Sequence, residues 1–597
     1  MSRGSFHFLD EDRVEREGVD VEHLRRLLAY LPAHRVLILL ALCALLLGTA
    51  CRLAGPWIIK VVVDRNLTPR TFDGLPWRVG LYLAALAGGM LFLYLQMLAV
   101  SILGQRVILG IRREMFSRLQ RLPVSFFDRS PAGRLMTRLT SDVEALQELL
   151  SSGLVATVGD AAVLAGTAGI LLWMDARLAL VTFAVLPPLL LFVEGVKTFI
   201  RRANREMRRK LARMNAFLQE RVSGIAVVKA FTGEEKAVRG FDALNRDFAD
   251  ESVRLTNFYS LYFPGVGLIA SVAVALILWR GGVGILSGAV TFGTLVAFLE
   301  YAQKFFDPIQ DMSDKYNILQ SALASAERIF QILDTEESPE YRPAAPPRGL
   351  PRAGPGAPAL EFRDVWFSYR PGEPVLRGVS FALGEGETGA IVGATGAGKT
   401  TILHLLCRFY EIERGEIRLF GREIRTIPRE ELRGILSLVP QDPVLFSGTI
   451  RGNIEAGGPQ VPRAAEISGV SRFASDWERG LDTAVGERGG RLSVGQRQLV
   501  SFARALAREP RLLLLDEATS SVDPVTEHEV RRAVRQILSG RTSLVVAHRL
   551  STILSADRIL VMHRGTIRET GTHRELMEER GIYFRLFTLQ FGRESPA

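Results

Sequence analysis

Apolar residues form long continuous runs in the first half of the chain and short, separated runs in the second half. Six runs of about twenty mostly apolar residues have the length at which a helix crosses a hydrocarbon layer. They lie at Val36–Ile59, Val79–Leu103, Leu154–Trp173, Leu178–Val196, Leu261–Trp279 and Val290–Ile309. A turn around Ser287 and Gly288 separates the last two. The pattern predicts an all-α transmembrane domain of six helices.

The basic residues between these runs predict the orientation of the chain. The segments Arg106–Ala145 and Lys197–Thr256 hold 8 and 14 Lys and Arg residues, against 6 in the connections on the opposite side. Because basic residues resist translocation, the two rich segments should face the cytoplasm, where the spans continue as helical stalks. The charged N-terminus is also expected to be cytoplasmic. The net charge of +10 then needs no nucleic-acid partner.

The second half has the pattern of a soluble α/β domain. Seven prolines between Pro339 and Pro358 favour an extended linker. Beyond it, short apolar runs alternate with helical patterns, as in VWFSY, ETGAIVG, ILSLVP, RLLLLDE, TSLVVAH and RILVM. We therefore predict a transmembrane domain over 1–335, a Pro-rich linker over 336–358 and an α/β P-loop domain over 359–597, with the last located in the cytoplasm.

The segment GATGAGKTT carries the strongest chemical signal. It follows an apolar strand and begins a helix, the order that a phosphate-binding loop requires. Its glycines let backbone amides face phosphate oxygens, Lys399 supplies a charge to the β and γ phosphates, and Thr400 offers a hydroxyl to Mg²⁺. The predicted ATP-binding residues here are Gly393, Ala394, Thr395, Gly396, Ala397, Gly398, Lys399, Thr400 and Thr401.

A second element, RLLLLDE, ends a buried strand with two acids. Asp516 suits the Mg²⁺ shell, and Glu517 suits a role in polarising the attacking water. Phosphoryl transfer depends mostly on positioning and electrostatics, so a water-orienting carboxylate beside the metal is a reasonable requirement. On its own the motif would be a strand that ends in solvated acids. Beside a phosphate loop it indicates ATP hydrolysis with Mg²⁺.

Between these two elements lies LSVGQRQ, and the whole set resembles the nucleotide-binding domain of ABC transporters. The resemblance implies that Tyr369 stacks on adenine, that Gln441 senses Mg²⁺ and contributes to catalysis, and that His548 contacts the γ phosphate as a catalytic residue. It also assigns Ser493, Val494, Gly495 and Gln496 to the signature that contacts a partner's ATP, and Asp523 to the D-loop. The metal residues would be Thr400, Gln441 and Asp516.

The same resemblance implies a dimer and a transport function. Two such domains close head to tail around ATP in this family, and one chain carries one domain. The transmembrane half resembles the six-helix exporter type in LPVSFFDRSPAGRLMTRLTSDVEAL and NAFLQERVSGIAVVKAFTGEE. By that resemblance, the segments Phe126–Gly133 and Leu218–Gly224 would be coupling helices that touch the nucleotide domains.

One residue departs from the family pattern. The usual signature is LSGGQ, and Val494 replaces its first glycine. A β-branched side chain should hinder a close backbone contact with phosphate. With Glu517 and His548 present, this combination resembles one subunit of heterodimeric bacterial multidrug exporters, whose partner has a weakened Glu and a standard signature. We expect a second ABC half-transporter as the partner. A homodimer that tolerates valine is the alternative.

The cargo has few markers in the sequence. Arg52 and Arg280 lie near outer ends and are expected to snorkel. Glu300 and Lys304, four residues apart, are hypothesised to line the translocation cavity, with mutual neutralisation as the alternative.

The function that the resemblance implies is export of an amphipathic drug or lipid across the cytoplasmic membrane, among membrane lipids. An importer, a homodimeric lipid flippase and an ATP-gated channel or regulator are the alternatives. The predicted spans disfavour a soluble DNA-repair ATPase.

Overall fold

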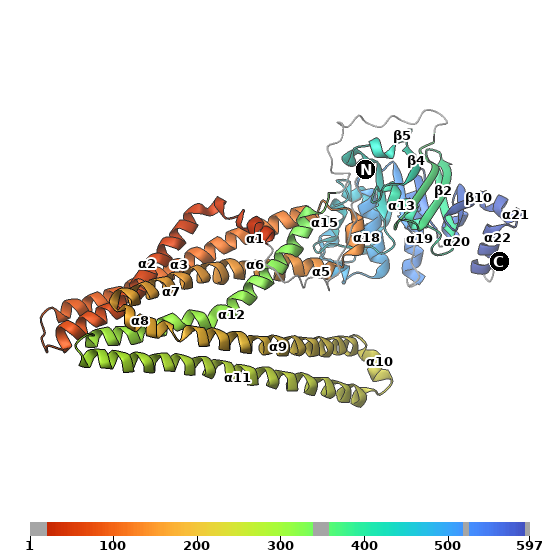
Figure 1. The fold of residues 1–597 in the computed structure, drawn as a ribbon. Coiled ribbons are helices and arrows are strands. Elements are labelled where there is room, and N and C mark those ends of the chain that lie inside the picture. The colour runs from red at the N-terminus through yellow and green to blue at the C-terminus, as the bar shows by residue number, and fades with distance from the viewer. Residues whose placement is uncertain (1–20, 338–357, 517–523, 548, 592–597) are drawn as a thin grey trace. The chain divides into compact units, whose positions relative to one another are not determined.

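A computed structural model describes residues 21–337, 358–516, 524–547 and 549–591 (Figure 1). The chain divides into two compact units, one made of Met1–Ser117 and Gly133–Asp334, the other of Arg118–Ala132 and Thr335–Ala597. A short stretch of the first basic connection therefore packs with the C-terminal unit. The change of unit at Asp334 coincides with the start of the Pro-rich composition.

The first unit is built from long helices. They are α1 (Val21–Leu28), α2 (Arg35–Val62), α3 (Leu75–Leu119), α5 (Ala132–Thr137), α6 (Val143–Glu148), α7 (Val155–Met174), α8 (Ala176–Phe183), α9 (Leu186–Ser223), α10 (Ile225–Ala230), α11 (Glu234–Leu286) and α12 (Phe292–Asp334). Within the described residues, five helical stretches are long and apolar enough to cross a membrane. The sixth helix, α12, carries Glu300 and Lys304 in its apolar part and is not among these five.

The helix boundaries follow the sequence pattern with two differences. The predicted span Leu178–Val196 is interrupted between α8 and α9, because prolines at the start of α9 cannot donate backbone hydrogen bonds to the preceding turn. The segment Leu218–Gly224 is not a separate short helix. It lies at the end of α9, and the short helix at the tip of this connection is α10, one step later. The predicted turn at Ser287 and Gly288 is present, with Gly288 at φ 73°.

Lys304 has a clear role inside the first unit. Pro56 lies within α2 and cannot donate a hydrogen bond to the Arg52 carbonyl, which is left without its helical partner. The Lys304 ammonium donates to that oxygen at 2.7 Å, and the buried Tyr301 hydroxyl donates to the next carbonyl, that of Leu53. The two donors thus attach α12 to the proline turn of α2. A cavity-lining role for Glu300 stays a prediction.

A second polar contact joins α7 to α12 and was not singled out from the sequence. Asp160, inside the predicted span Leu154–Trp173, forms an ion pair with Lys315. The Asp160 side chain is 31% exposed and the Lys315 side chain is 18% exposed. A carboxylate in an apolar run is costly unless it is paired, so the sequence could have indicated that Asp160 has a partner, but not which residue it is.

The second unit contains two sheets. A four-stranded sheet has the order β2 (Pro374–Leu383), β1 (Leu360–Ser368), β4 (Arg414–Leu419), β5 (Arg422–Glu423), and its neighbours are antiparallel. A six-stranded sheet has the order β10 (Thr566–Gly571), β9 (Arg558–His563), β3 (Thr388–Gly393), β8 (Thr542–Val546), β7 (Leu512–Asp516), β6 (Leu436–Val439). Strands β9, β3, β8, β7 and β6 run parallel to one another, and β10 pairs antiparallel with β9.

Helices complete the second unit. They are α4 (Val124–Arg129), α13 (Lys399–Leu406), α14 (Arg429–Ile435), α15 (Ile450–Glu455), α16 (Val461–Ser468), α17 (Val470–Ala474), α18 (Val494–Leu506), α19 (Pro524–Leu538), α20 (Leu550–Leu554), α21 (His573–Glu578) and α22 (Ile582–Phe591). Strands β3, β7 and β8 are almost wholly buried apolar runs, as expected of a parallel sheet covered on both faces. Their carboxyl ends meet at one edge, where ligands bind in open α/β sheets.

Candidate functional site

The phosphate loop lies between β3 and α13, and its glycines have backbone conformations that other residues rarely adopt. Gly393, Gly396 and Gly398 have φ values of 157°, 81° and 99°. A Cβ on Gly393 would lie 2.3 Å from the Met562 carbonyl oxygen on β9. A Cβ on Gly398 would lie 2.8 Å from a Leu376 methyl carbon. The loop backbone is therefore held close to its neighbours, with its helix-side amides free to face an anion.

Lys399 is positioned by the loop that it follows. It is 6% exposed, and its ammonium donates to the carbonyl oxygens of Gly393 at 2.8 Å and Ala394 at 3.1 Å. Burial lowers the pKa of Lys399, and the nearby Asp516 carboxylate opposes that shift. The ammonium is thus preorganised at the loop, and phosphate oxygens can replace the carbonyls as acceptors.

The other loop residues divide by exposure. Ala394, Thr395 and Gly396 are exposed, whereas Ala397, Gly398 and Thr401 are buried and Thr400 is half-buried. Thr400 lies in the first turn of α13, and Asp516 ends β7 with 9% exposure. The predicted metal donors Thr400, Gln441 and Asp516 offer only oxygen atoms, the donor type that Mg²⁺ prefers. Gln441 is exposed just after β6.

Tyr369, the predicted adenine-stacking residue, is half-buried beside α13. Its hydroxyl lies 3.2 Å from Thr401 Oγ1 and 3.4 Å from His404 Nδ1. The rings of Phe367 and Tyr410 pack edge-on against it at centroid distances of 4.9 Å and 5.0 Å. The residues His404 and Tyr410 were missed from the sequence, although HLLCRFY follows the phosphate loop directly.

Helix α4 contacts this aromatic group within the C-terminal unit. The Tyr410 hydroxyl donates a hydrogen bond to the Asp128 carboxylate. Arg129 Nη2 donates to the Tyr369 carbonyl oxygen at 3.4 Å. Burial and the bond to Asp128 raise the pKa of Tyr410, so its hydroxyl stays protonated and donates at neutral pH. Part of the predicted segment Phe126–Gly133 is therefore attached next to Tyr369, the residue predicted to stack on adenine.

The signature begins α18 with a capping box. Ser493 Oγ accepts a hydrogen bond from the Gln496 amide, and the Gln496 side chain accepts one from the Ser493 amide. The first amides of the helix, those of Val494 and Gly495, have no intrahelical acceptor and can bind an external anion. Gly495 is buried, and the Val494 side chain is 41% exposed beside these amides.

Three predicted site residues lie outside the described residues: Glu517 and His548, predicted to be catalytic, and Asp523, assigned to the D-loop. The structure describes the strand ends that precede Glu517 and His548. In the parallel register Asp516 of β7 is opposite Val546 of β8, and Ile391 of β3 is also opposite Val546.

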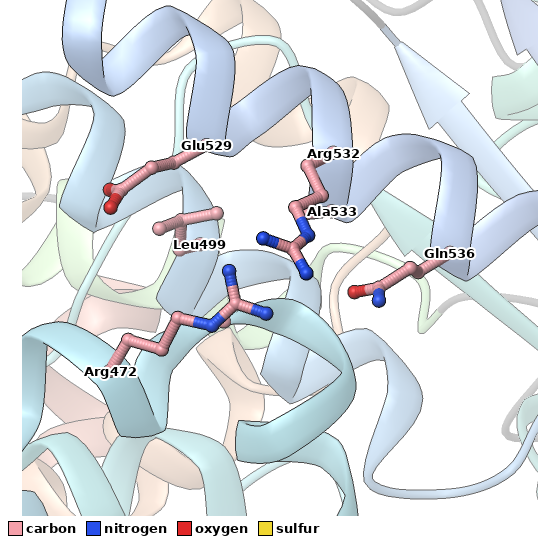
Figure 2. A pocket seen from close by; sticks show the side chains of 7 residues that line it. Arg472, Leu499, Glu529, Arg532, Ala533 and Gln536 are labelled. Atoms are coloured by element: carbon pink, nitrogen blue, oxygen red, sulfur yellow. The ribbon is translucent and has the colours of Figure 1, made fainter.

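A small hollow lies elsewhere in this unit, and Leu499 is the residue of α18 that lines it. Figure 2 shows Arg472, Arg532 and Gln536 around it, with Leu499 of α18 beside Glu529. It is lined by α17, α18 and α19 and includes no residue predicted to bind nucleotide.

Two family models match this chain, one in each half. A family model of the ABC transporter transmembrane region matches residues 38–309, and a model of the ABC transporter domain matches residues 376–520. An ABC transporter ATP-binding protein of Bacillus subtilis, YknV, is 36% identical over 98% of this chain and 97% of its own length. A probable multidrug resistance ABC transporter protein of the same species, YheH, is 35% identical over 87% of this chain and 78% of its length.

Two further similarities extend the picture. An ATP-dependent lipid A-core flippase of Syntrophus aciditrophicus is 32% identical over 96% of this chain and 95% of its own length. The solved structure of a bacterial Atm1-family ABC exporter with ATP bound is 28% identical, with a TM-score of 0.74 over 94% of this chain and 99% of that one. This chain belongs to the ABC transporter family, as a multi-pass exporter half-transporter whose cytoplasmic ATPase domain couples ATP hydrolysis to transport.

Proposed function

We propose that this protein exports amphipathic small molecules or lipids across the cytoplasmic membrane as half of a heterodimeric exporter. The observation that carries the proposal is the contrast between a phosphate loop that has its lysine and glycines in place and a signature that has lost its first glycine. Lys399 is held at the loop by two carbonyl groups, whereas Val494 projects beside the amides that would face the partner's ATP.

The hydrolytic site of this chain would use its own phosphate loop and the partner's signature. Thr400 and Asp516, with Gln441, would hold Mg²⁺, which neutralises charge on the β and γ phosphates when bound. Lys399 binds the same phosphates, Tyr369 stacks on adenine, and Glu517 orients the attacking water with His548 near the γ phosphate. Closure of the two ATPase domains would switch the transport cavity from inward-facing to outward-facing, and hydrolysis would reset it.

The altered signature favours a heterodimer. In the first turn of α18 the amides that bind phosphate belong to Val494 and Gly495, so a β-branched side chain at the first of them crowds the approaching oxygen. That defect falls on the partner's nucleotide, which would make the partner's site the weak one. A chain with a catalytic glutamate and an altered signature would form one complete site with a partner that has a standard signature but no catalytic glutamate.

Purification decides between the two assemblies. The protein is expressed from its native locus with an affinity tag, and the stoichiometric protein that elutes with it is identified. We expect a second half-transporter whose residue at the position of Glu517 is not glutamate. A pure homodimer with full cargo-stimulated ATP hydrolysis would refute the heterodimer.

Two alternative functions remain distinguishable. A homodimeric lipid flippase is favoured by the likeness to lipid A-core flippases. An ATP-gated channel or regulator would use the same ATPase domain. Flux of cargo against its gradient in vesicles, lost in Glu517→Gln, separates pumping from gating. Flux that only follows the gradient would support the channel.

A further inference from the structure

Two basic side chains of α9 converge on one aromatic ring of α12. The Arg201 guanidinium lies 5.7 Å and the Lys197 ammonium 5.8 Å from the centre of the Tyr316 ring. The Tyr316 hydroxyl is fixed in turn by the Gln320 amide at 2.9 Å. The ring face attracts cations without neutralising their charge, so both basic groups keep a positive charge with which they can bind an acidic group.

Among the described side chains, two of the three basic groups around this ring are paired with a carboxylate and the third is not. Lys197 contacts Glu194 at 3.1 Å, and Lys315, next to Tyr316, is paired with Asp160. Arg201 forms no ion pair with any described carboxylate. It is exposed, so its planar group is available for two parallel hydrogen bonds to a carboxylate or phosphate.

The depth of the cluster matches the head groups of the inner leaflet. Lys197 lies 21 residues after the start of α8 at Ala176, and Tyr316 lies 24 residues after the start of α12 at Phe292. At 1.5 Å per residue these are paths of about 32 Å and about 36 Å, close to the ~30 Å of a hydrocarbon core. Above the cluster, α9 and α12 share an apolar core that includes Leu189, Phe305 and Phe306.

We propose that Arg201 and Lys197, placed over Tyr316, bind the acidic head group of an inner-leaflet amphipath. The apolar tail then lies along the membrane part of α9 and α12. The inference rests on the proposed export of amphipathic molecules and narrows it to anionic ones. A transported cargo and a resident lipid share this chemistry, and Glu194 is displaced from Lys197 when the acidic group binds.

The test uses the full-length protein, with its partner where one co-purifies, in phosphatidylcholine nanodiscs. A spin-labelled phosphatidylglycerol reports binding by its immobilised fraction, and a spin-labelled phosphatidylcholine is the neutral probe. We expect preferential binding of the acidic lipid, and an affinity about tenfold weaker in Arg201→Ala, from loss of a charge-assisted contact. Arg201→Lys should retain part of the preference. The control is Arg209→Ala, on the same helix but paired with Glu206 at 2.7 Å, which should bind like the wild type.

Equal immobilisation of the two lipids, or an acidic-lipid affinity that is the same in Arg201→Ala and Arg209→Ala, would overturn the proposal. ATP-dependent appearance of the acidic lipid in the outer leaflet of vesicles identifies cargo, whereas binding without transfer identifies a resident lipid. Because the binding measurement needs no ATP, it stands apart from the proposed function. If the wild-type protein transported no amphipathic molecule in the presence of ATP, that result would count against the proposed export function instead.

Discussion

The phosphate loop and the signature both present backbone amides at the start of a helix, but they are built in opposite ways. In the phosphate loop, Gly393 and Gly398 have positive φ values and lie against Met562 and Leu376, so neither has room for a side chain. At the signature, the helix starts with ordinary dihedral angles and an exposed first residue, Val494. At the phosphate loop, the fold of this chain limits which side chains fit. At the signature, only the nucleotide bound to the partner limits them. Substitutions at the two sites should therefore fail for different reasons.

The largest effect is expected from Lys399→Met, which removes the loop's charge and keeps its length. Loss of a donor to the developing phosphate charge should lower ATP hydrolysis by about a hundredfold or more. The fold should not suffer, because an ammonium that is costly to bury is replaced by an apolar chain. Hydrolysis is measured in detergent or lipid, and thermal unfolding is the control. A variant that hydrolyses ATP at the wild-type rate would refute the role of Lys399.

A chemical labelling experiment would test the same assignment in the unmodified protein. Lys399 is the only lysine in residues 359–597, so an amine-reactive reagent labels this domain at one side chain. We expect ATP to protect the corresponding peptide, as read by mass spectrometry.

Two glycines of the same loop provide a matched pair for the next prediction. Gly398→Ala brings a Cβ against Leu376, whereas a Cβ on Gly396 has no atom within 4 Å. Both positions have positive φ, so each alanine costs about 1 kcal/mol of backbone strain. The clash at Gly398 should add about 1–3 kcal/mol of destabilisation. Chemical denaturation should rank Gly398→Ala well below Gly396→Ala in stability. Equal losses would mean that conformation alone, and not close packing, restricts the loop.

A smaller effect is expected where α4 meets the aromatic group beside Tyr369. Tyr410→Phe removes the hydroxyl that donates to Asp128, and Asp128→Asn removes the charge of the acceptor. The two changes should be coupled by about 1 kcal/mol in a double-mutant cycle. Hydrogen exchange of the α4 amides measures the attachment, and Asp482→Asn, in the exposed pair with Arg451, is the control. Additive effects would show that the bond contributes nothing to holding α4.

Much of the architecture could be predicted from sequence, since each prediction rested on a strong periodic signal. The six apolar-run strands VWFSY, ETGAIVG, ILSLVP, RLLLLDE, TSLVVAH and RILVM lie in β1, β3, β6, β7, β8 and β9. The mixed strands β2, β4, β5 and β10 were missed because their polar and apolar residues do not form such runs.

Contacts between side chains that are distant in the sequence could not be predicted. The sequence leaves Lys304 available to line a cavity, and only the position of Pro56 on another helix explains its bond to the Arg52 carbonyl. The pair Asp160 and Lys315 is likewise separated by more than 150 residues, so no local pattern joins them. The attachment of Asp128 to Tyr410 also depends on tertiary packing.

The smallest effect on turnover is expected at the signature, and its size separates the two assemblies. Val494→Gly restores the first glycine without touching the capping box of Ser493 and Gln496, so the helix should tolerate it at a cost of about 1 kcal/mol or less. In a heterodimer this signature faces the partner's weak site, and maximal ATP hydrolysis should change less than twofold, whereas ATP affinity at that site rises. In a homodimer the same change repairs both sites at once, because each hydrolytic phosphate loop then meets a standard signature. The maximal rate of ATP hydrolysis would rise severalfold, and that result would mean that Val494 slows hydrolysis in a homodimeric exporter.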